Sequence, residues 1–220
     1  MSKINKDEQF GFMIDQSRCV GCRTCQMACK DGRDRPVGVN FRRVYEYEGG
    51  GYSMDENGTI ISNDVFAYYS SISCNHCTDP ACIKACPTGA MMKTRYGIVM
   101  VNDKMCVGCK ACAMACPYGA PQFNKAEKHM NKCDGCIDRI DEGLDPFCVA
   151  SCPFRALEWG NIADLRAEHG FLASVAPLID ESATLPNLVV KPEKNTRKSG
   201  NRDGVMHLPH SYQGVKDDII

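Results

Sequence analysis

The sequence predicts an α+β fold built from small, repeated, cysteine-rich units, and three observations support this. The 220-residue chain holds sixteen cysteines but only one tryptophan. All sixteen cysteines fall into four groups of four, with none left over. Two of the groups are near copies of each other, and a short apolar run typical of a strand leads into each. Something other than aromatic burial must therefore order much of the interior.

The four groups are named by their order in the chain. Groups one and three, CVGCRTCQMAC and CVGCKACAMAC, are identical at eight of eleven positions and form an internal repeat. Groups two and four have longer spacings, TDPA and IDRIDEGLDPF, which lengthen a loop without changing the number of thiols. In order, the groups are Cys19, Cys22, Cys25 and Cys29; Cys74, Cys77, Cys82 and Cys86; Cys106, Cys109, Cys112 and Cys116; and Cys133, Cys136, Cys148 and Cys152.

Metal ligation explains this pattern better than a disulfide framework does. Cysteines so closely spaced in runs of four are poorly placed to pair stably, and no leader points to an oxidising destination. Tetrahedral zinc needs two C-x-x-C pairs and has no use for the third, equally spaced thiol of groups one and three. Covalent haem needs C-x-x-C-H, which does not occur in the chain.

Iron–sulfur clusters account for that third thiol. Three thiols at i, i+3 and i+6 can surround three irons of one cubane, while the fourth thiol reaches a neighbouring cluster, as in the bacterial C-x2-C-x2-C-x3-C-P run. Proline follows the last thiol of groups two, three and four, whereas Lys30 follows that of group one. Four such half-units predict tandem bacterial-type ferredoxin-like units that hold four [4Fe-4S] clusters, with all sixteen cysteines as ligands.

Local signals predict the elements around the groups. GFMIDQSRC and IVMVNDKMC each indicate a strand, an Asx turn and then a first thiol. FRRVYEYE and DVFAYYSSI predict the two strands of a hairpin whose glycine-rich tip is GGGYSMDENGT. NIADLRAEHG predicts a helix capped by Asn161 and ended by Gly170. After about residue 175 the chain is polar and rich in proline, which predicts an extended tail without a core of its own.

These elements divide the chain into four regions. Residues 5–35 and 125–175 are expected to form one ferredoxin-like pair, from groups one and four. Residues 60–124 are expected to form the second pair, from groups two and three. Residues 36–59 form the predicted β-hairpin insertion, and residues 176–220 form the tail, which is expected to contact a partner.

Several other side chains have two interpretations. His76 could tune a cluster through a hydrogen bond to sulfur, or it could be a partly exposed neighbour of the thiols. His207 and His210 have metal-like spacing, but the polar tail favours contact with solvent or a partner. Tyr68 and Tyr69 are expected to pack in the core. The basic residues of the tail indicate either a solvated surface or a docking face for an acidic partner: Lys191, Lys194, Arg197, Lys198 and Arg202.

No pattern in the sequence indicates catalysis on a substrate. The chain contains no G-x-G-x-x-G, P-loop or Ser/His/Asp constellation. With 26 Lys+Arg against 27 Asp+Glu, it has no basic field for nucleic acid. It also lacks eighteen consecutive apolar residues, so no direct membrane span is expected, and its charged start predicts no signal peptide of its own. The predicted class is a non-catalytic electron-transfer protein.

The residues also resemble a known family. The four groups, together with ACPYGAPQFN, KCDGC and VAPL…LPNLVVKP, closely resemble the electron-transfer B subunits of anaerobic dimethyl sulfoxide reductases, within the molybdopterin oxidoreductases. The likeness covers almost the whole chain. The resemblance implies a relay of electrons from a quinol-oxidising membrane subunit or cytochrome, through four clusters, to a molybdopterin catalytic subunit that reduces dimethyl sulfoxide.

The resemblance further implies that the groups exchange ligands. Some nitrate reductase subunits replace a thiol of group three and hold a three-iron cluster, but Cys109 is present here, so four cubanes are expected. The implied ligand sets are set one, Cys19, Cys22, Cys25 and Cys152; set two, Cys29, Cys133, Cys136 and Cys148; set three, Cys74, Cys77, Cys82 and Cys116; and set four, Cys86, Cys106, Cys109 and Cys112.

By the same likeness, the protein would be peripheral in a membrane-associated complex, on the periplasmic side after export with its catalytic partner. The cysteine framework is shared with subunits of polysulfide, thiosulfate and formate enzymes, which gives one competing hypothesis. A free, soluble polyferredoxin is another. The tail of 45 residues without thiols favours a subunit, because a diffusing carrier has little need of it.

Overall fold

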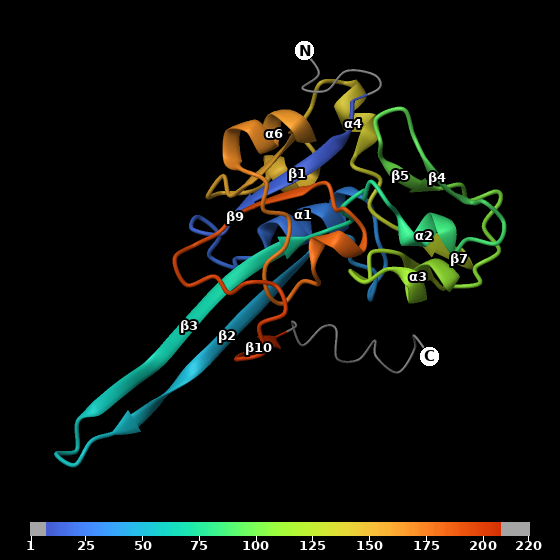
Figure 1. Ribbon diagram of the computed structural model, residues 1–220. Coiled ribbons are helices and arrows are strands. Elements are labelled where there is room, and N and C mark those ends of the chain that lie inside the picture. Colours follow the sequence, from blue (N-terminus) through green and yellow to red (C-terminus); the bar gives the residue numbers. More distant parts are fainter. Residues whose placement is uncertain (1–7, 208–220) are drawn as a thin grey trace.

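The computed structural model describes residues 8–207, and within them the chain folds into short helices around four small sheets (Figure 1). The helices lie mostly within or beside the cysteine groups, so that each thiol-bearing loop leads into a helical turn. In chain order they are α1 (Thr24–Gly32), α2 (Ala81–Lys84), α3 (Ala111–Ala115), α4 (Ile137–Asp141), α5 (Phe147–Ala150), α6 (Ile162–His169) and the 3₁₀ helix η1 (Glu181–Ala183).

One sheet joins segments that lie far apart in the sequence. Strand β1 (Phe10–Asp15) pairs antiparallel with β8 (Leu157–Asn161) and parallel with β9 (Leu188–Lys191). Every residue of β1 is buried. One face contributes to the main core, and the other packs with α6, which is why the strand reads as a continuous apolar run.

A long hairpin projects from the body as an arm (Figure 1). It consists of β2 (Arg43–Met54) and β3 (Ile60–Ile72), and β10 (Gly204–His207) adds a third strand at its base. The sequence predicted the glycine run at the tip, but the structure places this run inside β2. A bulge at Gly50, whose φ is 83°, shifts the register there, so the strand continues to the turn at 55–59.

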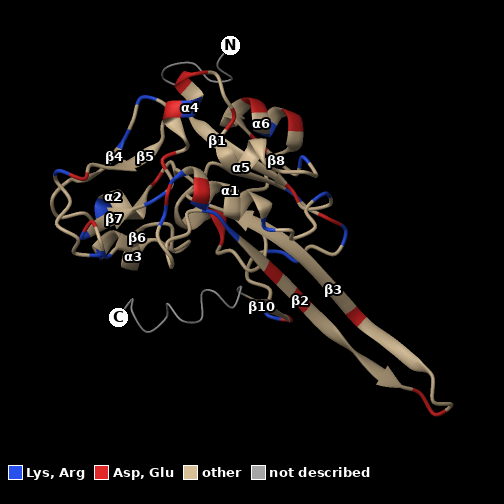
Figure 2. Cartoon of the chain, turned by 180° about the vertical axis from the view of Figure 1, so that it is seen from behind, with Lys and Arg blue, Asp and Glu red and all other residues tan. Residues whose placement is uncertain are grey.

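The arm is acidic along its length. Asp and Glu side chains mark both strands and the tip, whereas no Lys or Arg lies between Val44 and Phe66 (Figure 2). The arm extends beyond the predicted insertion at 36–59, because β3 runs as far as Ile72, directly before group two. The hairpin therefore leads directly to the first thiol of group two.

Two shorter sheets support groups two and three. Strand β4 (Met91–Lys93) pairs with β5 (Val99–Val101), and β6 (Gln122–Asn124) pairs with β7 (His129–Asn131), both antiparallel. Around them, Met91, Val99 and Met130 form a small core with buried thiols of both groups. This core is separate from the larger one around β1.

The local signals that lead into the repeated groups are confirmed. After β1, the Asp15 carboxylate accepts a hydrogen bond from the Ser17 N–H at 3.0 Å. After β5, the Asn102 side chain accepts one from the Lys104 N–H at 3.1 Å. These are the two predicted Asx turns. The Asn161 cap of α6 is also present, since its side chain accepts a hydrogen bond from the Ala163 N–H at 3.0 Å.

The tail is more integrated than the sequence suggested. It was expected to lie over the body without joining a core, but Val189 and Val190 of β9 are fully buried, and the strand completes the sheet around β1. At the start of the tail, the Ala176 carbonyl accepts a hydrogen bond from the Tyr68 hydroxyl at 2.8 Å. The tail therefore stabilises the body from within its sheet.

Other predictions about single side chains have mixed outcomes. Tyr68 is buried as predicted, whereas Tyr69 is only partly buried, on the opposite face of the strand. Of the five basic tail residues, Lys191 forms an ion pair with Asp15 and Arg197 forms one with Asp64. His207 lies 3.0 Å from a Glu48 carboxylate oxygen, and His210 lies outside the described residues.

Within residues 8–207, no helix combines the length and the apolar character needed to cross a bilayer.

Candidate metal centres

The loops of the internal repeat have the same backbone. Gly21 and Gly108, each directly before the second thiol of its group, have φ values of 69° and 67°. The residues directly after these thiols, Arg23 and Lys110, both have a φ of 61°. A Cβ at Gly108 would lie 2.6 Å from the Lys128 carbonyl oxygen, so glycine is needed for space as well as for its φ. This backbone curls each loop around its own thiols.

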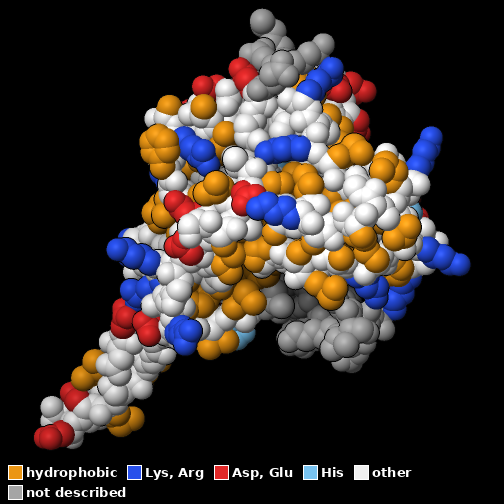
Figure 3. Space-filling model, turned by 45° about the vertical axis from the view of Figure 1, so that its right-hand side comes forward, with side chains coloured by type: hydrophobic (Ala, Val, Ile, Leu, Met, Phe, Trp, Pro, Cys, Tyr) orange, Lys and Arg blue, Asp and Glu red, His pale blue; other side chains and the backbone are white. Residues whose placement is uncertain are grey.

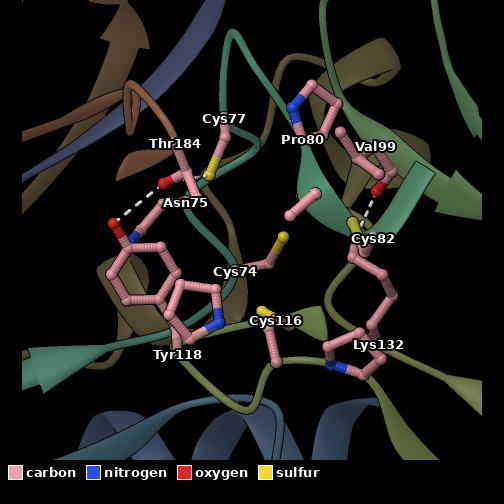
Figure 4. Close-up of a pocket in the computed structure, with 14 residues that line it drawn as sticks. Cys74, Asn75, Cys77, Pro80, Cys82, Val99, Cys116, Tyr118, Lys132 and Thr184 are labelled. Atoms are coloured by element: carbon pink, nitrogen blue, oxygen red, sulfur yellow. Dashed lines mark hydrogen bonds between the residues drawn. The ribbon is translucent and has the colours of Figure 1, made fainter. Parts of the chain in front are cut away.

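Set three surrounds a cavity of about 360 Å³, counting the part open to solvent. Figure 4 shows the Sγ atoms of this set pointing toward a common space between β5, α2 and the group-three loop. The thiol of Cys116 comes from group three, whereas the other three thiols come from group two. The cavity lining also includes Tyr118, Thr184 and Lys132.

Set one surrounds a second cavity, of about 320 Å³. Cys19, Cys22 and Cys25 line it from group one, and Cys152 lines it from group four. In the described residues, no three His, Cys, Asp or Glu side chains are placed to hold one metal ion. The thiols of sets one and three instead line one hollow each.

The thiols of sets two and four are also brought together. Burial raises the pKa of Cys29 to about 12, and repulsion from Cys148 and Cys136 contributes to the rise. Burial raises the pKa of Cys133 as well, and Cys29 is the first of its thiol neighbours.

In set four, burial raises the pKa of Cys112 to about 11, with further contributions from Cys106, Cys86 and Cys109. Each of the four sets thus gathers thiols from two of the groups.

The four sets follow one another through the molecule. Cys25 of set one interacts electrostatically with Cys148 of set two. Cys133 of set two interacts in the same way with Cys74 of set three. Cys82 of set three and Cys112 of set four pack in the same small core. The order in space is therefore one, two, three, four.

The most exposed thiols lie at the two ends of this row. Cys22 of set one and Cys109 of set four are the exposed thiols, whereas all four thiols of set two are buried. Apolar side chains surround both ends at matching positions of the repeat: Val20 and Met27 are 51% and 58% exposed, and Val107 and Met114 are 68% and 81% exposed. Figure 3 brings the side that carries α2 and α3 forward and shows apolar side chains spread over it.

A buried guanidinium lies between sets one and two. Arg42 is only 2% exposed, and it donates hydrogen bonds to the carbonyl and hydroxyl oxygens of Ser71 and to the hydroxyl of Ser73. The Ser71 hydroxyl in turn lies 3.3 Å from Cys25 Sγ. Burial alone would lower the pKa of Arg42, but nearby thiols, Cys148 first, raise it.

Arg42 also provides a test of the cofactor. Its Nε is buried and has no hydrogen-bond partner among the described residues, although thiols of sets one and two lie around the side chain. A sulfur-rich anionic group held by those thiols would supply both the acceptor and the opposite charge. The donor set and the buried cation therefore fit an iron–sulfur cluster.

A second buried cation lies between sets two and three. The Lys132 ammonium donates hydrogen bonds to the carbonyl oxygens of Val99 and, at 2.6 Å, Cys133. Burial alone would lower the pKa of Lys132, but Cys74, Cys133 and Cys82 raise it. Neither Arg42 nor Lys132 could be recognised as a site residue from the sequence. In the sequence, Arg42 lies near the start of a predicted strand and Lys132 comes directly before a thiol, but many exposed basic residues have such neighbours.

The observed environment of His76 differs from one of the two environments predicted for it. The structure buries it completely, so the interpretation as a partly exposed neighbour is wrong. Phe10 packs edge-on against its ring, with centroids 5.3 Å apart. Burial lowers the pKa of His76 well below its usual value, and the cations Lys132 and Lys93 lower it further.

The matches to known families agree with this geometry. A 4Fe-4S dicluster domain matches residues 65–162, and a 4Fe-4S binding domain matches residues 10–31. Together with the thiol-bearing loops, these matches define an iron–sulfur electron-transfer protein with ferredoxin-type domains.

Proteins of similar sequence show which family of iron–sulfur proteins the chain resembles. The B subunit of anaerobic dimethyl sulfoxide reductase from Escherichia coli is 56% identical over 91% of this sequence and 97% of its own length. The subunit of the same name from Haemophilus influenzae is 53% identical over 92% of this sequence and 98% of its own length. The beta subunit of perchlorate reductase from Dechloromonas aromatica is 32% identical over 84% of this sequence and 75% of its own length.

The protein belongs to the family of anaerobic dimethyl sulfoxide reductase B subunits. These are non-catalytic, iron–sulfur electron-transfer subunits of reductase complexes.

Proposed function

We propose that this protein relays electrons from a quinol-oxidising membrane subunit or cytochrome, through four [4Fe-4S] clusters, to a molybdopterin catalytic subunit that reduces dimethyl sulfoxide. The observation that carries the proposal is the continuous row of four thiol sets, whose most exposed thiols lie at its two ends. The sixteen cysteines would hold the clusters in the sets defined above. When bound, each cluster supplies a one-electron site whose potential depends on hydrogen bonds, charge and exposure.

The side chains along the row have different roles at its ends and in its middle. The exposed apolar residues beside Cys22 and Cys109 offer contact surfaces at which a partner can approach the first and last sets. In the middle, burial of all four thiols of set two keeps water from them. Arg42 compensates negative charge between sets one and two, and Lys132 does so between sets two and three. On this proposal the catalytic partner and the membrane partner bind at opposite ends, on the periplasmic side.

Iron analysis tests the ligand sets directly. The anaerobically purified full-length protein, alone or with its partners, is expected to hold about sixteen iron atoms and as many acid-labile sulfides per molecule. A colourless, zinc-loaded sample would overturn the assignment, and about eight iron atoms would leave only two clusters.

Cys109→Ser is expected to change the electron paramagnetic resonance signal of one cluster and to leave the other three unchanged, because Cys109 lies in set four alone. Cys22→Ser, at the matching position of the repeat, provides the comparison and is expected to affect set one instead. If either variant altered the signals of both end clusters equally, the proposed separation of the sets would be wrong.

The two competing hypotheses predict different partners. A free polyferredoxin would be recovered by itself from anaerobically grown cells. A relay subunit would be recovered with a large molybdenum protein, whose own reaction distinguishes dimethyl sulfoxide from polysulfide, thiosulfate or formate. The likeness to dimethyl sulfoxide reductase B subunits over nearly their whole length favours the first substrate.

A further inference from the structure

The loop of group two differs from the other three at one position. In groups one, three and four, the residue before the second thiol is Gly21, Gly108 or Gly135, with φ values of 69°, 67° and 69°. Group two has His76 at this position, with a φ of 44°. A non-glycine residue in this region is strained, although histidine enters it more readily than most residues do. The protein thus keeps an imidazole where the loop geometry favours glycine.

Two N–H groups of His76 face thiols of different sets. Its backbone N–H lies 3.5 Å from Cys74 Sγ of set three. Its ring Nδ1 accepts a hydrogen bond from the Val99 N–H at 3.1 Å, so Nδ1 carries no proton and the ring proton lies on Nε2. That Nε2 lies 3.8 Å from Cys133 Sγ of set two, within reach of a hydrogen bond to sulfur.

The position of the ring is held from several sides. The His76 carbonyl accepts a hydrogen bond from the Asn187 side chain at 2.8 Å, which connects it to the tail. Phe10 covers one side of the ring, and the side chain is completely buried. Because the Val99 N–H fixes the tautomer, the ring presents a donor, and not an acceptor, to Cys133.

We propose that His76 is a positioning residue that connects sets two and three, with its backbone N–H stabilising the Cys74 thiolate and its Nε2–H stabilising the Cys133 thiolate. The inference rests on the proposed ligand sets. Each electron delivered to set two adds one negative charge beside Cys133 Sγ, and a fixed N–H donor favours that state over the oxidised one. His76 therefore raises the reduction potential at set two.

The main test is a matched pair of variants in the full-length protein purified with its clusters. His76→Leu keeps most of the side-chain volume but removes the ring donor, whereas His76→Gln restores a side-chain N–H. In redox titrations followed by electron paramagnetic resonance, His76→Leu is expected to lower one potential. The expected change in the reduction equilibrium is about tenfold, or about 59 mV for one electron. His76→Gln is expected to recover most of it.

Set three provides an internal control for this pair, because the backbone N–H that faces Cys74 remains in both variants. Unchanged potentials in a fully iron-loaded His76→Leu protein would overturn the proposal, and so would equal shifts in the Leu and Gln variants. Lys132→Met is expected to lower the potentials of sets two and three, because it removes the cation between them. Lys194→Met, which removes an exposed lysine, is expected to leave all potentials unchanged.

The unsubstituted protein gives a test that does not depend on folding of the variants. The sequence has five histidines. Among those described, His129, His169 and His207 contact carboxylates, and only His76 contacts a thiol. Labelling of the histidine rings alone with ¹⁵N should therefore give one ¹⁵N coupling to a reduced cluster, that of set two, in pulsed electron paramagnetic resonance.

Absence of that coupling in the iron-loaded protein would overturn the inference but leave the proposed relay intact. Absence of the clusters themselves would instead overturn the proposed function, which iron analysis shows separately.

Discussion

Arg42→Met is expected to reduce the amount of cluster-loaded protein and to lower its apparent free energy of unfolding by about 3–5 kcal/mol, the cost of leaving a buried charge without its partner. The guanidinium compensates the thiolates of sets one and two, and methionine of similar length cannot do so. Arg42 also stacks over the Phe12 ring at 4.6 Å, a contact that methionine keeps only in part. Denaturant titration under anaerobic conditions, followed by cluster absorbance, measures the loss.

One further variant separates charge from shape at this position, and a second variant provides a control on the surface. Arg42→Lys keeps the positive charge but loses the planar fork that reaches Ser71 and Ser73, so an intermediate loss is expected. Arg202→Met removes an exposed arginine and is expected to have no measurable effect. A wild-type midpoint for Arg42→Met would mean that the cation does not compensate the thiolates.

Val189→Asp is expected to detach the tail and to disturb the cluster of set three. Val189 is completely buried among Met13, Ile162 and Leu165, and a carboxylate there would have no partner. Such a substitution costs several kcal/mol, enough to break the pairing of β9 with β1.

The effect on set three follows from the residues just before β9. The Cys77 thiol lies 3.4 Å from the Thr184 hydroxyl, and that hydroxyl lies 3.0 Å from the Tyr118 hydroxyl (Figure 4). Losing these contacts exposes the cavity of set three to solvent.

Limited proteolysis measures detachment of the tail, and electron paramagnetic resonance measures the response of set three. Val205→Asp is the control, because Val205 lies in the same tail but is 61% exposed. Resistance of Val189→Asp to protease, with an unchanged signal from set three, would contradict the expected role of β9.

Features that depend on residues close together in the sequence could be predicted. The cysteine groups, the Asx turns at Asp15 and Asn102 and the Asn161 cap all act within a few positions of one another. Such signals can be recognised from local spacing because their hydrogen bonds join residues close in sequence.

Features that depend on distant segments could not be predicted from local patterns. LVVK at β9 is only four residues long and lies between prolines, so nothing local indicates that it pairs with β1. The burial of His76 depends on Phe10, Val99 and Cys133, which reach it from three other parts of the sequence. The burial of Arg42 and Lys132 could not be predicted either, because these two residues differ from basic residues on the surface only in what packs around them.

The pairing of β1 has a consequence for biosynthesis. This strand is completed at Asp15, yet the sheet partner that covers its second edge ends only at Lys191. At the usual rate of about 5–20 residues per second, a ribosome needs roughly 9–35 s to make the intervening segment. Throughout that interval the nascent FGFMID segment lacks its β9 neighbour, so the sheet around β1 is completed only after Lys191 has been made.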